Sequence, residues 1–456
     1  MKNKIFSLVV LVAAALALTS CFSDDKEENN GIRYTDTAIT SFGISSLKMV
    51  RDTVSKSGAD STYLKSVSTA AYKFYIDQTK GLIYNPDSLP YGAKTEKALV
   101  AFNIKNAGTV VIKSTADETF SILSTTDSLD FSVPRTIRVY SQDGTIYRNY
   151  TVTVNVHKQR GDVFNWNQLN ANAELAELTA KKAVANNGKM FVFGTKNGQT
   201  YGYSTSESDG NTWMQLSETF SQEAYKGVVA SNGYLYLADN GTVKRSADGQ
   251  LWETMGAAAV KQIVAASKTE LYALSGSNTL MVSKDNGATW NAEKLDDSAS
   301  KLPTENVSYT VNTLSTNGNI QRVMLVGKSA SSGTAVAWTK LVDTTGANTY
   351  VWNYVDGSDS YRLPLLTDLT VIDYDGKALA LGVKSGAFEK VMTSIDGGIS
   401  WKPSTGYAYP TGAVPSGAFT AAVDSRKFIW IVSGGQVWRG RINTLGWATD
   451  KKDFTE

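Results

Sequence analysis

The sequence predicts an all-β protein of two domains, a β-sandwich followed by a β-propeller. Short runs of alternating apolar and polar residues fill the first third of the chain. In the remainder one turn sequence recurs four times, and tryptophans recur at spacings of 38 to 62 residues. Repeats of this length each form one small sheet, so the pattern indicates sheets stacked around an axis.

The composition agrees with this fold class and excludes one class of partner. Glycine is abundant (37 residues) and proline sparse (8), which favours strands and tight turns over long helices. The 45 Lys and Arg residues nearly balance the 43 Asp and Glu residues. No basic field is left to attract a nucleic acid, so no nucleic-acid partner is expected.

The N-terminus predicts a secretory signal over residues 1–20. Lys2 and Lys4 precede an apolar run from Ile5 to Leu18, which is short for a transmembrane helix. The run ends in Leu18-Thr19-Ser20-Cys21, which resembles a bacterial lipobox. Cys21 is the sole cysteine and has no disulfide partner, so we expect it to be lipidated and to anchor the protein to a membrane. The alternative is a plain signal peptide with an incidental cysteine.

Residues 21–34 form a polar, mostly acidic segment without the apolar residues needed for packing, which predicts a flexible tether. Acidic residues just after the lipidated cysteine resemble the surface-export signal of Bacteroidota lipoproteins. The resemblance implies the outer leaflet of the bacterial outer membrane. The alternative is a lipoprotein that faces the periplasm.

Residues 35–158 are predicted to form an immunoglobulin-like β-sandwich. Asp143-Gly144 marks a hairpin turn, and beyond it Tyr150, Val152, Val154 and Val156 fall on one face of a strand. One apolar and one polar face suit an antiparallel sandwich, and the length suits an immunoglobulin-like module. The expected strands are Tyr72–Ile76, Leu99–Ile104, Val110–Lys113, Thr136–Tyr140 and Arg148–Val156. Residues 158–162 form the expected junction, and the propeller is expected over 162–456.

The residue types of the recurring turn follow from the geometry of a tight turn. Two copies fit Ser-x-Asp-x-Gly-x-Thr/Ser-Trp, and two deviate by one position. Asp and Ser side chains bond backbone N–H groups in tight turns, glycine supplies a positive φ, and the tryptophan opens the next strand. The turns resemble the Asp-box of sialidase-type propellers, and we expect them to be structural. Their members are Ser206, Asp209, Gly210 and Trp213; Ser246, Asp248 and Trp252; Ser283, Asp285, Gly287 and Trp290; Ser394, Asp396, Gly398 and Trp401.

Seven tryptophans mark the expected blades, and their six intervals predict six blades of four strands. The fourth interval is long, and a seventh blade marked by Trp338 is the alternative. The first and last tryptophans bracket the array, so we expect the N- and C-terminal strands to pair in one blade. The markers are Trp166, Trp213, Trp252, Trp290, Trp352, Trp401 and Trp447.

Both domains together resemble a two-domain Bacteroidota lipoprotein family, a domain of unknown function in which a β-sandwich precedes an Asp-box propeller. Besides the lipobox, three segments carry the resemblance: residues 74–77 (Phe-Tyr-Ile-Asp), 81–85 (Gly-Leu-Ile-Tyr-Asn) and 134–140 (Pro-Arg-Thr-Ile-Arg-Val-Tyr). The resemblance covers essentially the whole chain. It implies fold and location and carries no activity.

Candidate ligand-binding residues lie on the links between blades, where propeller ligands usually bind. The links Met214–Gly227, Tyr354–Leu366 and Lys402–Phe419 are rich in tyrosine. Tyrosine and arginine suit sugar or peptide recognition through stacking and bidentate hydrogen bonds. The candidates are Tyr225, Tyr361, Arg362, Tyr407 and Tyr409.

Few catalytic arrangements remain open. His157 is the sole histidine, so His-based triads and two-histidine zinc sites lack members, and no metal or cofactor is expected. Tyr361-Arg362-Leu363-Pro364 is similar to the Arg-Ile-Pro strand of sialidases but falls in the fifth blade instead of the first. A two-carboxylate glycosidase remains open, with Asp368, Asp373 and Asp375 as unranked candidates.

The sequence therefore predicts a surface lipoprotein whose propeller binds a glycan or an envelope protein, without catalytic activity. A glycosidase, sialidase-like or with two carboxylates, and a purely structural scaffold are the alternatives.

Overall fold

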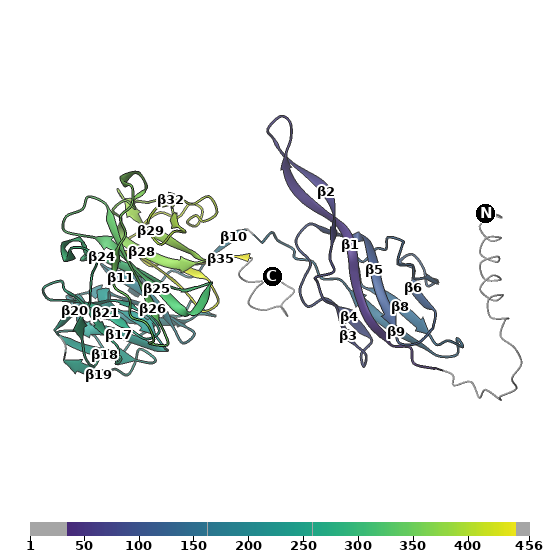
Figure 1. Ribbon diagram of the computed structural model, residues 1–456, viewed down its shortest axis with the longest axis horizontal. Coiled ribbons are helices and arrows are strands. Elements are labelled where there is room, and N and C mark those ends of the chain that lie inside the picture. Colours follow the sequence, from purple (N-terminus) through teal and green to yellow (C-terminus); the bar gives the residue numbers. More distant parts are fainter. Residues whose placement is uncertain (1–33, 162, 258, 444–456) are drawn as a thin grey trace, which may run out of the picture. The chain divides into compact units, whose positions relative to one another are not determined.

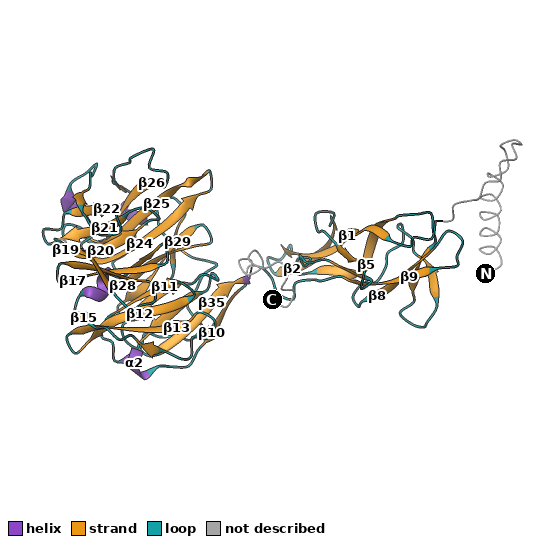
Figure 2. Ribbon diagram, turned by 90° about the horizontal axis from the view of Figure 1, so that it is seen from below, coloured by secondary structure: helices purple, strands orange, loops and turns teal. Residues whose placement is uncertain are grey.

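The computed structural model describes residues 34–161, 163–257 and 259–443 and divides the chain into two units, one ending at Asn155 and one beginning at Val156. The signal, the tether with Cys21, and Trp447 lie outside the described residues. Strands dominate both units, and the described helices are short turns (Figure 2). None of these helices is long and apolar enough to cross a membrane. They are α2 Ala173–Ala176, η1 Ala224–Gly227, η2 Ala299–Lys301 and η3 Asp359–Tyr361.

The first unit consists of two sheets (Figure 1). The sheet β2-β1-β5 contains β1 Ile39–Val54, β2 Asp60–Ser68 and β5 Ala93–Ile104. The sheet β3-β4-β9-β8-β6-β7 contains β3 Tyr75–Asp77, β4 Leu82–Tyr84, β6 Val110–Lys113, β7 Phe120–Ile122, β8 Arg135–Tyr140 and β9 Tyr147–Thr153.

A buried tyrosine joins the two sheets of the first unit. Tyr150 in β9 has no exposed surface, and its hydroxyl accepts a hydrogen bond from the N–H of Ile39 in β1 at 3.1 Å. The hydroxyl also donates to Oε1 of Gln78 at 2.6 Å. The predicted inward face of β9 is confirmed for Tyr150 and Val152, both fully buried.

Two features of this unit differ from the sequence prediction. The expectation of a purely antiparallel sandwich is wrong, because β4 pairs with β9 in parallel. A long chain segment separates β4 from β9, so the chain can cross back and place β9 alongside β4 in the same direction. The prediction also missed β1 and β2, which extend as a two-stranded ribbon beyond the sheet (Figure 1). Register shifts interrupt the alternation of β1, and β2 is almost wholly exposed.

The described residues of the second unit form six sheets in chain order, the β-propeller that the sequence predicts. The first three are β11 Lys181–Asn186, β12 Lys189–Lys196, β13 Gln199–Ser206 and β14 Met214–Gln215, with β15 Phe220–Ser221 paired to β13; β16 Val229–Ser231, β17 Tyr234–Asp239, β18 Thr242–Ser246 and β19 Glu253–Ala257; and β20 Val260–Ala266, β21 Leu271–Ser275, β22 Leu280–Ser283 and β23 Asn291–Ala292. The next two are β24 Glu305–Leu314, β25 Asn317–Lys328, β26 Ala335–Asp343 and β27 Asn353–Tyr354; and β28 Thr367–Tyr374, β29 Lys377–Lys384, β31 Met392–Ser394 and β32 Lys402–Pro403, with β30 Ala387–Phe388 paired to β29.

The sixth sheet joins the two ends of this unit. It has the order β10-β35-β34-β33, with β10 Phe164–Gln168, β33 Phe419–Val423, β34 Ile429–Ser433 and β35 Gln436–Ile442. β10 pairs antiparallel with β35, from Phe164 opposite Ile442 to Gln168 opposite Trp438. The predicted pairing of the first and last strands is therefore confirmed.

The long interval between Trp290 and Trp352 has a simple origin. It contains a single four-stranded sheet whose strands β24, β25 and β26 are 10, 12 and 9 residues long. Trp338 lies in β26, inside this sheet, and both Trp338 and Trp352 are fully buried.

The recurring turns have the predicted chemistry. In one of them the Ser283 hydroxyl donates to Asp285 at 2.7 Å and accepts from the Gly287 N–H at 2.8 Å. Asp285 accepts from the Thr289 N–H at 2.9 Å. The Trp290 indole N–H donates to the Gly287 carbonyl at 3.1 Å, which closes the turn.

The glycine of each turn also fits tightly against the preceding sheet. Gly210 has a φ of 78°, and a methyl group added there would approach Trp430 to 2.6 Å. Gly249 and Gly287 are confined in the same way, by Phe191 and Val243. The turn therefore serves both local geometry and packing between sheets.

Candidate functional site

A cavity of about 700 Å³ lies where the first strands of the six sheets converge. Its walls are rich in small residues because six strands must approach one axis. The alanines that line it are Ala183, Ala185, Ala230, Ala266, Ala421 and Ala422.

Side-chain hydroxyls hold neighbouring first strands together around this axial cavity. The Thr420 hydroxyl in β33 accepts a hydrogen bond from the Ala183 N–H in β11 at 2.8 Å. The Ser308 hydroxyl in β24 accepts from the Val371 N–H in β28 at 2.7 Å. These bridges between sheets satisfy backbone groups that have no strand partner at the axis.

Charged residues gather at one end of the axial cavity. Each sheet has four main strands that run antiparallel in turn, so all first strands run in the same direction and begin at the same end. We call this end the cavity mouth. It is defined by Lys181, Lys182, Glu223, Tyr225, Lys226, Lys261, Gln262, Glu305, Asn306 and Asp368, all of which line the cavity. The recurring turns follow the third strands and lie at the opposite end.

Lys182 is held by a backbone carbonyl instead of a carboxylate. Its Nζ donates to the Lys226 carbonyl oxygen at 2.8 Å, and Nε2 of Gln262 donates to the same oxygen at 3.2 Å. Burial lowers the pKa of Lys182 to about 8, and no acidic group opposes this effect. The mouth therefore contains a cation that the protein itself does not neutralise.

Lys181 is buried more completely than Lys182. Its Nζ donates to the carbonyls of Leu178 at 3.0 Å and Ala418 at 3.3 Å. Burial lowers its pKa to about 8, and the charge of Asp368 partly opposes the shift. Asp368 itself accepts from the Phe419 N–H at 3.0 Å and has a φ of 54°. Lys181 from β11 and Asp368 from β28 thus hold the start of β33 and add charge to the mouth.

Tyr225 is presented by the short helix η1. Its N–H donates to the Thr200 hydroxyl at 3.2 Å, which fixes η1 against β13. Burial raises the pKa of Tyr225 to about 12, and the charges of Glu223 and Asp368 add to the shift. At neutral pH the ring is therefore an uncharged surface with one hydroxyl donor.

The carboxylates singled out in the sequence do not form a glycosidase pair. Asp368 and Asp373 lie five residues apart on one strand, roughly 16 Å at the usual rise per residue, whereas glycosidase pairs are roughly 5–10 Å apart. Asp375 lies in the following turn, where it accepts from the Tyr407 hydroxyl at 2.7 Å and from Lys377 at 3.1 Å. Within the described residues, His, Cys, Asp and Glu nowhere form a group of three or more that could hold a metal ion.

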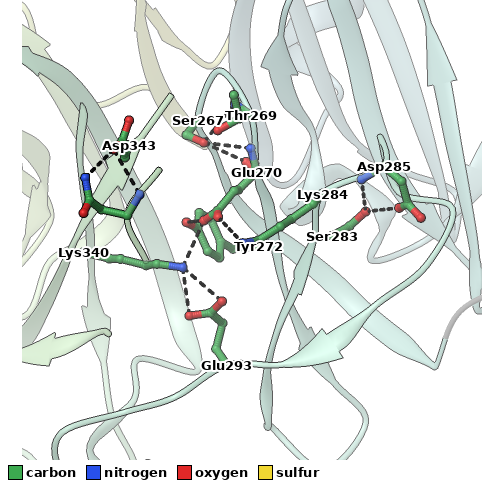
Figure 3. A network of polar contacts seen from close by, with 11 residues as sticks. Ser267, Thr269, Glu270, Tyr272, Ser283, Lys284, Asp285, Glu293, Lys340 and Asp343 are labelled. Atoms are coloured by element: carbon green, nitrogen blue, oxygen red, sulfur yellow. Dashed lines mark hydrogen bonds and ion pairs between the residues drawn. The ribbon is translucent and has the colours of Figure 1, made fainter. Parts of the chain in front are cut away.

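A second polar cluster lies between the third and fourth sheets (Figure 3). Lys340 in β26 keeps only 2% of its side-chain surface and bonds Glu270 and Glu293, each at 3.0 Å. Burial alone would raise the pKa of Glu270, but the Tyr272 hydroxyl and Lys340 hold it below its usual value. Burial raises the pKa of Glu293. None of these residues lines the axial cavity, so we interpret the cluster as a clamp between sheets.

The five predicted ligand-binding residues are not brought together. Tyr225 alone among them lines the axial cavity. Arg362 donates to the Tyr354 hydroxyl at 3.2 Å and to Asp356 at 3.1 Å, beside a cavity of only about 10 Å³. Tyr361 is half exposed on the same link. Since no arginine lines the axial cavity in the described residues, a sialidase-type arginine triad is not assembled there.

Tyr407 and Tyr409 lie in a hydrophobic cluster between the fifth and sixth sheets. Tyr407 bonds Asp375, and the Tyr409 hydroxyl accepts from the Gly382 N–H at 2.8 Å. The Tyr409 ring stacks on Phe388 with centroids 4.4 Å apart. Their rings and hydroxyls are thus engaged within the protein.

The sequence prediction missed the lysines of the mouth. Lys181 and Lys182 open β11, and Lys261 is the second residue of β20. The sequence does contain a signal for these lysines. The first strands of all repeats begin at the same end of the propeller, so charged residues at their starts come together there. The signal becomes visible only after strands have been assigned to their order within each sheet.

The chain belongs to the DUF6242 family. The DUF6242 beta propeller domain matches residues 160–450, and the domain of unknown function (DUF6242) N-terminal domain matches residues 42–154. No curated protein matches the chain.

Solved structures are similar to the chain at low identity and low TM-score. YCF48 from Cyanidioschyzon merolae is 14% identical over 60% of this chain and 98% of that one, with a TM-score of 0.32. An Aleuria aurantia lectin mutant in complex with alpha-methyl-L-fucoside is 13% identical over 57% and 88%, with a TM-score of 0.34. An auxiliary nutrient binding protein from Bacteroides thetaiotaomicron is 7% identical over 75% and 93%, with a TM-score of 0.38. None of these likenesses bears on the ligand of this chain.

Proposed function

We propose that this protein is a lipid-anchored surface protein whose propeller binds a glycan or protein ligand at the cavity mouth without converting it. The axial cavity carries the proposal. Its volume of about 700 Å³ falls within the roughly 300–1,000 Å³ of typical ligand sites. Its walls combine small apolar residues with hydroxyls and carboxylates, and lysines gather at one end.

Binding is favoured over hydrolysis by the state of the carboxylates at the mouth. Asp368 accepts a backbone hydrogen bond, and Glu305 pairs with Lys328 at 2.8 Å. Glu223 pairs with Lys226. A glycosidase needs one carboxylic acid and one free carboxylate on either side of the scissile bond. The acids at the mouth are committed to other partners, and Asp373, which also lines the cavity, lies five residues from Asp368 along β28.

The anchoring and the architecture of the proposal rest on the sequence and on the sheet order. In this account the six sheets are the six blades of one ring, and the first unit is an immunoglobulin-like spacer or docking module. Cys21 carries the lipid, and the acidic tether directs the protein to the cell surface.

Binding is tested by probing glycan and peptide arrays with the protein lacking its signal, followed by product analysis with every ligand found. The proposal expects saturable binding and unchanged ligand. Release of reducing sugar or peptide fragments would contradict it and establish a hydrolase.

Anchoring is tested with Cys21→Ala in the native host. The unmodified protein is expected in the membrane fraction and accessible to protease on intact cells, and the variant in the soluble fraction. Membrane association that survives Cys21→Ala would contradict the lipid anchor, and protease resistance on intact cells would contradict the surface location.

A further inference from the structure

The mouth of the axial cavity has an excess of positive charge. Two ion pairs there are internally neutral, namely Lys226 with Glu223 and Lys328 with Glu305. The other charged groups at the mouth are three lysines and one carboxylate. They are Lys181, Lys182, Lys261 and Asp368. Among the described residues, neither Lys182 nor Lys261 forms an ion pair.

The two lysines without carboxylate partners have free hydrogen-bonding capacity. An ammonium group has three donors, and Lys182 uses one of them on the Lys226 carbonyl. Lys261 is exposed at the start of β20, next to Gln262, which bonds that same carbonyl. Lys182 in β11 and Lys261 in β20 therefore both line the mouth, from the first and the third sheet, where an anion would gain charge-assisted hydrogen bonds.

We propose that the cavity ligand is an acidic glycan whose carboxylate or sulfate binds the ammonium groups of Lys182 and Lys261. This inference rests on the proposed function and names the substrate class for the same site.

The other groups at the mouth suit the remainder of a sugar. Tyr225 offers an uncharged ring for stacking on a pyranose, and Gln262 and Asn306 offer amides for its hydroxyls. Lysines act as point charges instead of planar forks, so carboxylate and sulfate are both accommodated. This combination of hydroxyl-binding and anion-binding groups favours an acidic glycan over an acidic peptide.

The test measures affinity by calorimetry for four probes of equal length: tetragalacturonate, a sulfated galactose tetramer, neutral galactotetraose and tetra-aspartate. We expect at least one acidic sugar to bind about tenfold or more tightly than the neutral tetramer. Comparison of tetragalacturonate with the sulfated tetramer identifies which anion is preferred. Equal binding of neutral and acidic sugars, or preferential binding of tetra-aspartate, would overturn the inference and leave a binding propeller in place. No binding by any probe, together with empty arrays, would overturn the proposed function as well.

Variants locate the anion. Lys182→Gln and Lys261→Gln are each expected to weaken binding of the acidic sugar about tenfold, with little effect on any neutral sugar that binds. Lys268→Gln is the matched control, because Lys268 is exposed on the turn after the same strand, at the opposite end. Lys261 is exposed, so its variant remains informative if Lys182→Gln unfolds. Affinity unchanged within twofold in Lys261→Gln would overturn the assignment.

Discussion

Single buried cations account for two distinct features of the second unit. Lys340 is neutralised by two carboxylates between sheets, whereas Lys182 has only a carbonyl at the cavity mouth. A fully buried charge is costly without a partner, so Lys340 is neutralised, whereas the half-buried Lys182 stays open at the cavity mouth. Substitution of the two lysines, and a change of pH, are therefore expected to have different effects on stability.

Lys340→Met is expected to lower the free energy of unfolding by about 3–5 kcal/mol, because it leaves Glu270 and Glu293 buried without their cation. Urea unfolding measures the change. Lys284→Met is the control, since Lys284 pairs with the same Glu270 but is 60% exposed, and it is expected to cost less than about 1 kcal/mol. Equal effects of the two variants would contradict the clamp.

The unfolding free energy is expected to rise with pH between about 8 and 9.5. Burial lowers the pKa of Lys181 and Lys182 to about 8 from an ordinary 10.5, so the unfolded chain binds more protons than the folded one in this range. The gain is about 1 kcal/mol for each lysine. Urea unfolding at both pH values should show it, and Lys182→Met should reduce the gain. Stability that falls over this range in the unmodified protein would contradict the assigned burial.

At the scale of elements, the recurring turns join local geometry to packing between sheets. The same glycine adopts a positive φ, offers its carbonyl to the indole, and leaves space for the neighbouring sheet. One such turn escaped the sequence pattern. Asp343 accepts from the Thr345 N–H at 2.9 Å and the Asn348 N–H at 3.2 Å, just before the buried Trp352. It shares the carboxylate-to-backbone bonds of the recurring turns, but the buried Nε1 of Trp352 has no hydrogen-bond partner among the described residues, unlike the indole that closes the turn at Gly287.

Gly210→Ala is expected to lower the free energy of unfolding by about 3 kcal/mol, because the new methyl group meets both a positive φ and the Trp430 ring. Gly198→Ala is the matched control. Gly198 has a φ of 76° with nothing within 4 Å, so only the backbone cost of about 1 kcal/mol applies. Thermal and urea unfolding of both variants measure the difference, and equal losses would show that packing against Trp430 contributes nothing.

The all-β class and the propeller domain could be predicted because turn and tryptophan patterns are local in sequence. The parallel pairing of β4 with β9 could not, since strand direction depends on how a long connection crosses the molecule. The predicted binding residues differ in the same way. Tyr225 lies on a link between sheets and lines the axial cavity, whereas Tyr407 and Tyr409 on another link turn into a core cluster that no local pattern reveals. The lysines of the mouth come from separate repeats, and only the fold brings them together.

At the scale of the whole molecule, the second unit is closed by strands from its two ends. β10 and β35 pair along five residues, and Gly440 in β35 leaves room for the rings of Trp166 and Phe164. A side chain at Gly440 would approach Trp166 to 2.5 Å. The closure therefore depends on a small residue at this position.

Gly440→Val is expected to displace β10 and to lower the free energy of unfolding by about 2–3 kcal/mol. Limited proteolysis should then cleave near residues 160–169, and thermal unfolding should begin earlier. Gly318→Ala in β25 is the control, because an added methyl group there meets nothing within 4 Å. Unchanged proteolysis in Gly440→Val would show that β10 is not needed to hold the ring.

Ligand capture at the axis, and not on the outer links, is tested most directly by comparing two tyrosine variants on the glycan array. Tyr225→Ala removes the ring at the cavity mouth, and Tyr361→Ala removes an exposed ring on the link that carries Arg362. We expect Tyr225→Ala to lose binding while Tyr361→Ala keeps it, with both variants folded as judged by circular dichroism at the assay temperature. Retained binding in Tyr225→Ala together with lost binding in Tyr361→Ala would contradict the axial site.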